Sequence, residues 1–361
     1  MFRKATAKKK KTGMKKLLTD LTKDELTQIA KEEGLPTYRA RQLSEWLALG
    51  VDFDGMTNLP KPLRESLSDK YSALGVKIIK EAKSKDGTVK FLYELRDGNL
   101  IEGVLMSYKY GHTLCVSTQV GCRMGCAFCA SGLDGLLRNL TAGEMLGEVI
   151  SANAYLRKRG EKERVGNVVL MGSGEPLDNY EEVTKFLRLL GESQGIGQRS
   201  VSLSTCGLTE GVRRLADEGY SITLCVSLHA PTDEKRLTVM PTARKYKVRE
   251  IIDSAKYYFE KSGRRVIYEY AMMRNLNISD SDADMLATLT KGYPSHVNLI
   301  PLNETGSSLV GVNRREAEEF LKKLTKRGVS ATIRRSLGED VEGACGQLRR
   351  KYTEKDNTED K

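Results

Sequence analysis

The chain has 361 residues, enough for one large α/β domain and a small additional domain, and its hydrophobic (39%) and charged (30%) contents are ordinary for a globular protein. No apolar run approaches the ~18 residues that a membrane helix needs, and no secretory signal peptide is visible. Seven cysteines, three of them clustered, fit a reducing compartment better than a disulfide scaffold. We therefore expect a cytoplasmic protein with no membrane partner.

Basic residues gather at the N-terminus. Residues 1–16 carry eight Lys and Arg and no acid, so this segment supplies most of the net charge of +11. We expect a disordered tail here, which either stays solvated or attracts phosphates. Met14 is an alternative start that removes most of the excess charge, so the tail carries no argument for RNA binding.

Residues 17–75 read as a small helical domain. Thr22 and Glu25 form a capping box at the start of one helix. Apolar residues repeat at helical spacing over residues 37–49, and two prolines near residue 60 mark the start of a third helix. Residues 76–112 change to alternating apolar and polar positions with Asp-Gly turns, which predicts an antiparallel meander.

From residue 113 the chain repeats a unit of strand, loop and helix. Short apolar runs alternate with amphipathic stretches of ten or more residues, which predicts an α/β domain with a parallel sheet. Ligand sites of such sheets lie at the carboxyl ends of the strands. The last residues, 351–361, are polar and are expected to fray. The six runs are 114–118, 167–171, 200–204, 222–228, 266–272 and 296–300.

Three cysteines with the spacing C-x₃-C-x₂-C follow the first run: Cys122, Cys126 and Cys129. Three thiolates this close can hold three irons of a four-iron, four-sulfur cluster and leave the fourth iron open. The alternatives are three buried cysteines or a zinc knuckle. Structural zinc needs a second ligand pair at a similar loop distance, and the next candidates, Cys206 and His229, are far away and unpaired.

Candidate ligand-binding residues follow the later runs. Residues 171–176 form a glycine-rich turn that ends in Glu175-Pro176, where a carboxylate can accept from an ammonium group. Ser204 and Ser227 offer hydroxyls for a ribose or a carboxylate, and residues 298–303 end the sixth run. Each motif alone is more typical of an ordinary turn or strand end, so the inference depends on their combination.

Two further cysteines have the features of reacting thiols. Cys345 lies between glycines near the C-terminus, where a thiol is accessible, and Cys115 precedes the cysteine triplet by seven residues as a candidate partner. Cys206 and Cys225 are assigned to packing. The two remaining histidines outside the motifs, His112 and His296, are assigned structural roles.

Together these motifs resemble the RlmN/Cfr family of radical S-adenosylmethionine (SAM) RNA methyltransferases over about residues 17–350. G-E-P at 174–176 is similar to RlmN rather than Cfr. Ser173 departs from the methionine usual in the family, and residues 304–312 are unlike its proline-containing linker. The motifs that carry the resemblance are T-N-L-P at 57–60, C-V-S-T-Q-V-G-C at 115–122, S-L-H-A-P at 227–231 and A-C-G-Q-L at 344–348.

The resemblance implies a partial (β/α)₆ radical SAM barrel over residues 113–350, with the helical domain and the meander before it and a C-terminal catalytic cysteine loop. It implies one 4Fe-4S cluster on Cys122, Cys126 and Cys129, and two SAM molecules per turnover. By match to the family, the SAM-binding residues are Gly174, Glu175, Ser204, Ser227, Leu228, His229 and Asn303.

The resemblance also implies a mechanism for methylating an unreactive adenine carbon. Cys345 takes a methyl group from one SAM, and a second SAM is cleaved to a radical that activates this methyl group. The methylene then joins the adenine, and Cys115 releases the product by forming a disulfide with Cys345. Glu102 is the implied base for the ring proton, unless it is a strand residue that faces solvent.

The implied substrates are 23S rRNA, methylated at carbon 2 of adenine, and tRNA, with the target base exposed from its stack. The helical domain, with Arg39 and Arg41, is expected to bind RNA. An external flavodoxin-like or ferredoxin-like reductant and a monomeric state are also expected. The alternatives are methylation at carbon 8, a radical SAM enzyme acting on a small molecule, and a non-enzymatic iron–sulfur RNA-binding protein.

Overall fold

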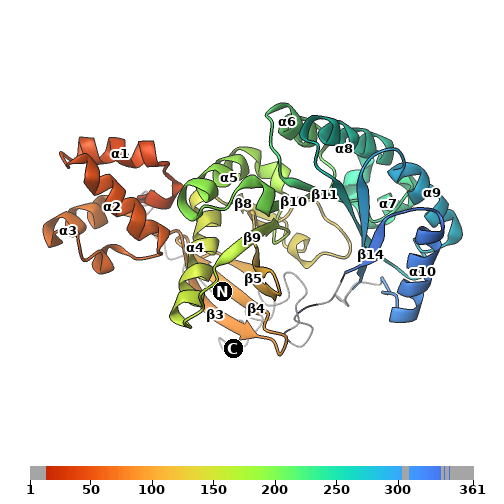
Figure 1. Ribbon diagram of the computed structural model, residues 1–361, viewed down its shortest axis with the longest axis horizontal. Coiled ribbons are helices and arrows are strands. Elements are labelled where there is room, and N and C mark those ends of the chain that lie inside the picture. The colour runs from red at the N-terminus through yellow and green to blue at the C-terminus, as the bar shows by residue number, and fades with distance from the viewer. Residues whose placement is uncertain (1–13, 303–308, 335–336, 338–340, 342–361) are drawn as a thin grey trace, which may run out of the picture.

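A ten-stranded mixed β-sheet forms the centre of the molecule (Figure 1). The computed structural model describes residues 14–302 and 309–334, together with residues 337 and 341. Across the sheet the strands follow the order β14-β13-β12-β11-β10-β9-β6-β5-β4-β3. Their bounds are β3 (Val76–Lys83), β4 (Val89–Leu95), β5 (Leu100–Tyr108), β6 (Gly111–Cys115), β9 (Val165–Leu170), β10 (Val201–Thr205), β11 (Thr223–Ser227), β12 (Val266–Met272), β13 (Ser295–Pro301) and β14 (Ala331–Ile333).

Parallel pairing joins the strands from β6 to β14, and antiparallel pairing joins β3 to β6. The predicted parallel α/β sheet and antiparallel meander are therefore confirmed, although the meander continues the main sheet. The three-residue strand β14 was not predicted, because so short a segment has no readable period. Among the described residues, β3 and β14 are the two ends of the sheet and do not pair with each other, so the barrel is partial.

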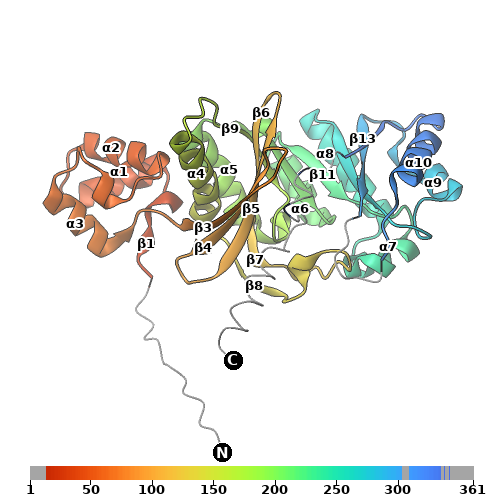
Figure 2. The ribbon, with the colours of Figure 1, turned by 90° about the horizontal axis from the view of Figure 1, so that it is seen from below.

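Helices follow the parallel strands and lie along the outer side of the curved sheet (Figures 1 and 2). The main hydrophobic core fills the space between the sheet and these helices. Glu144, three residues after Thr141, completes a capping box at the start of α4. The helices are α4 (Ala142–Lys158), α5 (Tyr180–Gln194), α6 (Thr209–Asp217), α7 (Asp233–Val239), α8 (Val248–Ser262), α9 (Asp280–Thr290) and α10 (Arg314–Lys326).

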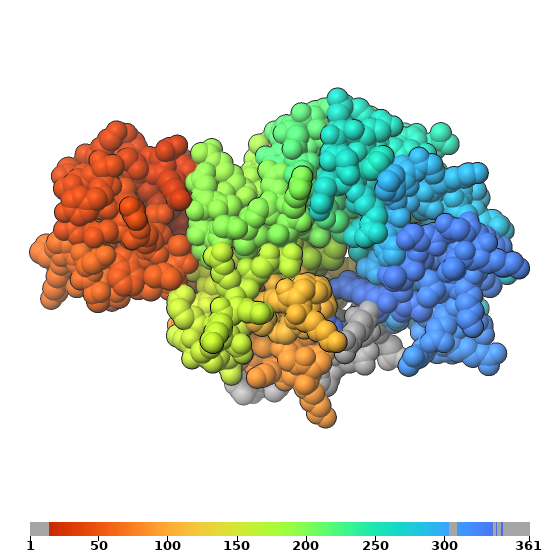
Figure 3. Space-filling view, viewed as in Figure 1, coloured from red at the N-terminus to blue at the C-terminus, as the bar shows by residue number. Residues whose placement is uncertain are grey.

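Three N-terminal helices form a lobe that protrudes from one side of the molecule (Figure 3). They are α1 (Lys23–Glu32), α2 (Thr37–Ala48) and α3 (Lys61–Lys70), and they pack around a hydrophobic core of their own. The predicted capping box is confirmed: the Glu25 amide donates to Thr22 Oγ1 (3.2 Å), and the Thr22 amide donates to Glu25 Oε2 (2.8 Å). The lobe thus has the three helices that the sequence predicts.

The basic N-terminal segment is described only from Met14 onward. Lys16 begins the short strand β1 (Lys16–Leu17), which pairs in parallel with β2 (Tyr71–Ser72). The Lys15 ammonium donates to the carbonyl of Ser68 (2.5 Å). These two lysines, predicted to belong to the tail, therefore contact the helical lobe. Residues 1–13 and 351–361 lie outside the described residues.

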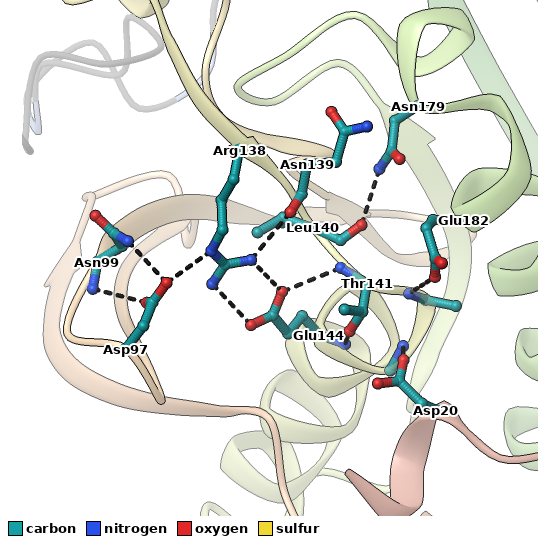
Figure 4. A network of polar contacts seen from close by, with 12 residues as sticks. Asp20, Asp97, Asn99, Arg138, Asn139, Leu140, Thr141, Glu144, Asn179 and Glu182 are labelled. Atoms are coloured by element: carbon teal, nitrogen blue, oxygen red, sulfur yellow. Dashed lines mark hydrogen bonds and ion pairs between the residues drawn. The ribbon is translucent and has the colours of Figure 1, made fainter. Parts of the chain in front are cut away.

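Polar contacts attach the lobe to the N-terminus of α4 (Figure 4). The free amides of the first turn find acceptors outside the helix: Ala142 donates to Glu182 Oε2 (2.8 Å) and Gly143 to Asp20 Oδ1 (2.6 Å). Carboxylates at this end also compensate the positive end of the helix dipole. Because Asp20 belongs to the lobe and Gly143 to the barrel, this bond joins the two parts.

The lobe approaches α4 so closely that residue 143 has no room for a side chain. A Cβ atom on Gly143 would lie 2.5 Å from the backbone nitrogen of Asp20 and 2.6 Å from the carbonyl carbon of Thr19. Both neighbours are backbone atoms, so the lobe itself must move to relieve the clash.

Among the described residues, no helix is both long enough and apolar enough to cross a lipid bilayer. This agrees with the lack of long apolar runs in the sequence.

We predict that Gly143→Ala displaces the lobe and costs about 1–3 kcal/mol of unfolding free energy, the usual range for overpacking. The matched control is Gly191→Ala in α5, where the nearest atom to a new Cβ is 3.8 Å away. That change is expected to stabilise the protein by about 0.5–1 kcal/mol, because alanine is the better helix former. Urea unfolding of both full-length variants is the measurement, and equal stability would contradict the close contact.

Candidate active site

The cysteine triplet lies in a loop clamped at both ends. After β6 the chain forms β7 (Gln119–Gly121), which pairs antiparallel with β8 (Leu136–Asn139), and the loop lies between them. The Cys122 amide donates to the Gly135 carbonyl (3.0 Å) and closes the base of the loop. The Ala127 amide donates to the Val239 carbonyl (2.9 Å), which ties the loop to the end of α7 on the same side of the molecule (Figure 2).

The three thiols lie in apolar surroundings. Cys122 is buried, Cys126 and Cys129 are half-buried, and Cys126 and Phe128 pack against a small core that includes Met240. Burial is the main cause that raises the pKa of Cys122 to about 11 and that of Cys126 to about 12, and the neighbouring cysteine thiols contribute to both shifts. Iron binding must therefore displace protons from these thiols, and the cations then supply the missing positive charge.

This donor set fits a four-iron cluster. Among the described residues, no three His, Cys, Asp or Glu side chains converge closely enough to bind a single metal ion. A cubane cluster carries each thiolate on a different iron, so its ligands need not converge on one point. All three cysteines lie within the loop that the Cys122–Gly135 bond closes, and the Cys129 amide donates to the Cys126 carbonyl (3.1 Å).

The glycine-rich turn after β9 packs against the segment that leads from β6 to the cysteine loop. The Thr118 amide donates to the Ser173 carbonyl (2.8 Å), and the Ser173 amide donates to Ser117 Oγ (2.9 Å). Gly174 has a φ of +111°, and a Cβ there would lie 2.6 Å from Thr118 Oγ1. Only glycine fits this backbone. Ser173, which departs from the family pattern, makes these contacts with its own backbone atoms and not with its side chain.

Glu175 is buried and already bonded. Its Oε2 accepts from the Cys206 amide (2.7 Å) and its Oε1 from the Leu177 amide (3.1 Å), so it joins the ends of β9 and β10. Burial raises the pKa of Glu175, while the amide donors oppose this shift. Each carboxylate oxygen has a second acceptor position, so a further bond to an ammonium group remains a prediction.

The predicted hydroxyl pair is brought together at the same edge. Ser204 on β10 and Ser227 on β11 are both half-buried, and their Oγ atoms are 3.3 Å apart. The two strands run in parallel, which puts both hydroxyls at the carboxyl edge of the sheet. Leu228 follows directly and is fully buried.

His229 is held in one orientation and one charge state. Its φ of +56° is unusual for a residue with a side chain, and the Asn277 amide group donates to its carbonyl (2.7 Å). His229 Nδ1 accepts from the Ala271 amide (3.0 Å), which leaves the proton on Nε2. Burial, and then the charge of Arg236, lowers the pKa of His229 to about 3. The neutral ring meets Phe128 of the cysteine loop edge to face, at 4.7 Å between centroids.

Glu102 faces the interior, so its solvent-facing alternative is wrong. It is only 8% exposed, and its Oε1 lies 3.6 Å from the ammonium group of Lys90. In the sheet register, Val104 pairs with Lys90 on one side and with Cys115 on the other. Side chains alternate along a strand, so Glu102 shares this face with Lys90 and with the buried Cys115.

Two predicted site residues, Cys345 and Asn303, lie outside the described residues. Among the six cysteines that the structure describes, no disulfide joins one to another. The Cys115–Cys345 disulfide therefore stays a prediction. Cys206 and Cys225 are buried, and the histidines outside the motifs bond to neighbouring hydroxyls: His112 to Ser107, and His296 to Ser330 and Thr332.

Sequence reasoning missed three residues of the site: Phe128, Lys90 and Arg236. Phe128 stands within the cysteine triplet, so its position alone was a usable signal. Lys90 and Arg236 had none, because a charged residue in a strand or helix is normally exposed. Both are almost completely inaccessible in the structure, at 1% and 0% exposure.

A cysteine triplet at the carboxyl edge of a partial α/β barrel defines a radical SAM enzyme. In agreement, residues 116–286 match the radical SAM superfamily, and residues 17–72 match the ribosomal RNA large subunit methyltransferase N-terminal domain. A solved structure, described as a radical SAM methyltransferase from Sphaerobacter thermophilus, is 42% identical and superposes with a TM-score of 0.88 over 93% of this chain and 99% of that one.

Curated relatives identify the family more closely. A probable dual-specificity RNA methyltransferase RlmN from Clostridium perfringens strain 13 is 48% identical over 94% of this chain and 98% of its own. One from Clostridium botulinum strain Alaska E43 is 46% identical over 96% and 99%. The chain belongs to the RlmN family of radical SAM RNA methyltransferases. Membership implies a 4Fe-4S cluster and SAM as cofactors.

We predict that alanine at Cys122, Cys126 or Cys129 abolishes the cluster. The anaerobically reconstituted parent should contain four irons and four sulfides, since each cysteine holds a different iron. The matched control is Cys225→Ala, which removes a buried thiol from β11 and should leave the cluster intact. Iron and sulfide analysis is the measurement. A full cluster in any of the three ligand variants would refute this ligand set.

Proposed function

We propose that this enzyme methylates carbon 2 of an adenine in 23S rRNA and in tRNA, through a methyl group carried on Cys345. The observation that supports this best is that Cys115 and Glu102 are both buried on the same face of the sheet, shortly before the cysteine loop. The names of the RlmN relatives support an RNA substrate. The target carbon is inert toward direct methyl transfer, so a covalent carrier is chemically reasonable.

The bound cluster and SAM supply the one-electron chemistry that activates the methyl group. Two SAM molecules would be needed in each turnover: Cys345 would take its methyl group from one, and the other would bind at the cluster. The protein's own residues orient the second SAM. The ends of β9, β10 and β11 present Gly174, Ser204 and Ser227 to it, and neutral His229 adds no repulsion toward the positive sulfonium.

Glu102 takes the proton that leaves the adenine ring after the methylene carbon bonds to it, and the unpaired electron left on the adduct would return to the cluster, which supplies one-electron chemistry when bound. The ammonium of Lys90 lies 3.6 Å from Glu102 Oε1 and holds the carboxylate in place. Lys90 is therefore a positioning residue for the base.

Cys115 completes the reaction. Its sulfur bonds to the sulfur of Cys345, the bond from that sulfur to the methylene carbon breaks, and the carbon takes a proton to become the product methyl group. The disulfide so formed needs two electrons from an external reductant before the next turnover. A flavodoxin-like or ferredoxin-like protein in the cytoplasm is the proposed reductant, and the enzyme is proposed to act as a monomer.

The helical lobe, residues 17–75, is proposed to bind RNA. The guanidinium of Arg39 stacks over the exposed ring of Tyr38, at 5.0 Å from its centroid, and Arg41 is exposed on the same helix. An aromatic ring beside basic groups suits both bases and phosphates.

The proposed reaction predicts a specific product. Nucleosides from the rRNA and tRNA of cells that carry the gene should contain 2-methyladenosine, and cells lacking the gene should lose it. Chromatography with mass spectrometry against 2-methyladenosine and 8-methyladenosine standards is the measurement. Loss of 8-methyladenosine instead would establish the Cfr-like alternative, and no change in either RNA would refute the proposal and favour a small-molecule substrate.

The proposed role of Cys115 predicts a trapped intermediate. Cys115 lies at the end of β6, before the cysteine loop, so Cys115→Ala should keep the cluster and the methylation of Cys345. Product release should fail, and protein purified from cells should carry RNA attached through Cys345. Nuclease digestion and peptide mass spectrometry detect the adduct.

The control is Cys115→Ala/Cys345→Ala, which should carry no RNA. If the single variant turns over normally, or is methylated at Cys345 without attached RNA, the assignment of Cys115 is wrong.

A further inference from the structure

Arg236 on α7 is a fully buried cation in the middle of the cofactor edge. Its side chain is 0% exposed. The guanidinium donates to four backbone carbonyls: Nη2 to Cys206 (2.5 Å) and Ser227 (3.3 Å), Nε to Leu228 (3.2 Å) and Nη1 to Tyr246 (3.4 Å). The first three carbonyls belong to the ends of β10 and β11, where SAM is expected to bind.

These bonds connect Arg236 to the other strand ends. Cys206, whose carbonyl binds Arg236, donates its amide to Glu175 at the end of β9 (2.7 Å). Leu228 is followed by His229, whose ring accepts from Ala271 on β12 (3.0 Å). One guanidinium therefore stands in a continuous polar network that links the carboxyl ends of four neighbouring strands.

Among the described residues, no aspartate or glutamate forms an ion pair with the Arg236 guanidinium, although Asp233 lies within electrostatic range. Burial accordingly lowers the pKa of Arg236. Carbonyl dipoles offset only part of the free-energy cost of burying a charge. An arginine that only held the strand ends together would therefore be expected to pair with a counter-ion.

The proposed negative partner of Arg236 is the cluster in the cysteine loop. Two contacts bring this loop close to Arg236: Val239, at the end of α7, accepts from the Ala127 amide (2.9 Å), and Cys206, whose carbonyl binds Arg236, packs in the same small core as Cys126. Cys126 is a proposed cluster ligand. A four-iron cluster on three thiolates has a net negative charge, which increases by one when the cluster is reduced. A fixed cation close to this loop therefore stabilises the reduced cluster more than the oxidised one.

We propose that Arg236 is a positioning residue with two separable effects on the cofactor site. Its planar fork holds the ends of β10 and β11 in the geometry that binds SAM, and its positive charge raises the reduction potential of the cluster. The inference depends on the cofactors of the family, and it holds whichever RNA or adenine carbon is the substrate.

Two substitutions separate the effects. Arg236→Gln removes the charge and keeps one amide donor, whereas Arg236→Lys keeps the charge and loses the planar fork. The matched control is Arg249→Gln, which removes the same charge from an exposed side chain on α8 that pairs with Asp253. All are made in the full chain, reconstituted anaerobically, with iron content measured first.

The first measurement is the midpoint potential of the cluster. It is obtained by reductive titration without SAM, with the reduced cluster detected by electron paramagnetic resonance. We expect a more negative potential for Arg236→Gln and potentials near the parent's for Arg236→Lys and Arg249→Gln. If Arg236 had a purely structural role, the midpoint potentials of the lysine and glutamine variants would either both shift or both stay at the parent value. Either result would overturn the electrostatic part of the proposal.

The second measurement is equilibrium dialysis of radiolabelled SAM. We expect at least tenfold weaker binding for both Arg236 variants and unchanged binding for Arg249→Gln. If Arg236→Lys binds SAM as tightly as the parent, the proposal that the guanidinium holds the ends of β10 and β11 for SAM binding is wrong.

If Arg236→Gln fails to hold four irons, Arg236→Lys decides. Weakened SAM binding at the parent potential supports the proposal, and any other combination rejects it. Loss of rRNA and tRNA methylation plays no part in either readout, so failure of the proposed function and failure of this inference remain distinguishable.

Discussion

The carboxyl edge of the sheet depends on buried side chains that take over hydrogen bonds where the strands end. Backbone amides and carbonyls at a strand end lose their ladder partners, and leaving one unpaired away from water costs about 1–3 kcal/mol. Here four polar side chains from loops and helices bind those groups: Glu175, Asn179, Arg236 and Asn277. Asn179, for example, donates to the carbonyls of Thr118 and Leu140 (both 2.9 Å).

This arrangement fixes the site before any ligand binds. Because the strand ends are already held, Gly174 and the Ser204–Ser227 pair keep their positions at the edge. The cysteine loop joins the same arrangement through Ala127 and the ring contact between Phe128 and His229. A preorganised site of this kind loses little conformational entropy when cofactors bind.

A second network links the RNA-binding candidate to the catalytic barrel. The strand β8, which flanks the cysteine loop, places Arg138 between Asp97 (2.6 Å) and Glu144 (2.7 Å), and Glu144 lies in the first turn of α4 (Figure 4). The lobe docks onto that same turn through Asp20. Arg138 is partly buried and bonds to two carboxylates, so this pairing is stronger than an exposed one. The helical lobe and strand β8 are therefore both held by contacts to the first turn of α4.

The sequence by itself determined the order of elements and the fold class, and it predicted the cluster ligands. These depend on local features: the capping box at Thr22, the apolar runs of the parallel strands, and a cysteine spacing that lies within one loop. The resemblance to a known family added the proposed roles of Cys115, Cys345 and Glu102.

Only the tertiary structure decided which charged residues are buried. Lys90 and Arg236 read as ordinary surface residues because their strand and helix carry other polar groups, and their partners come from segments distant in the chain. Glu102 was ambiguous for the same reason: the sequence gives the alternation of a strand but not which face is covered. Burial is a property of the packed sheet, in which strands from distant parts of the chain meet, so no local pattern contains it.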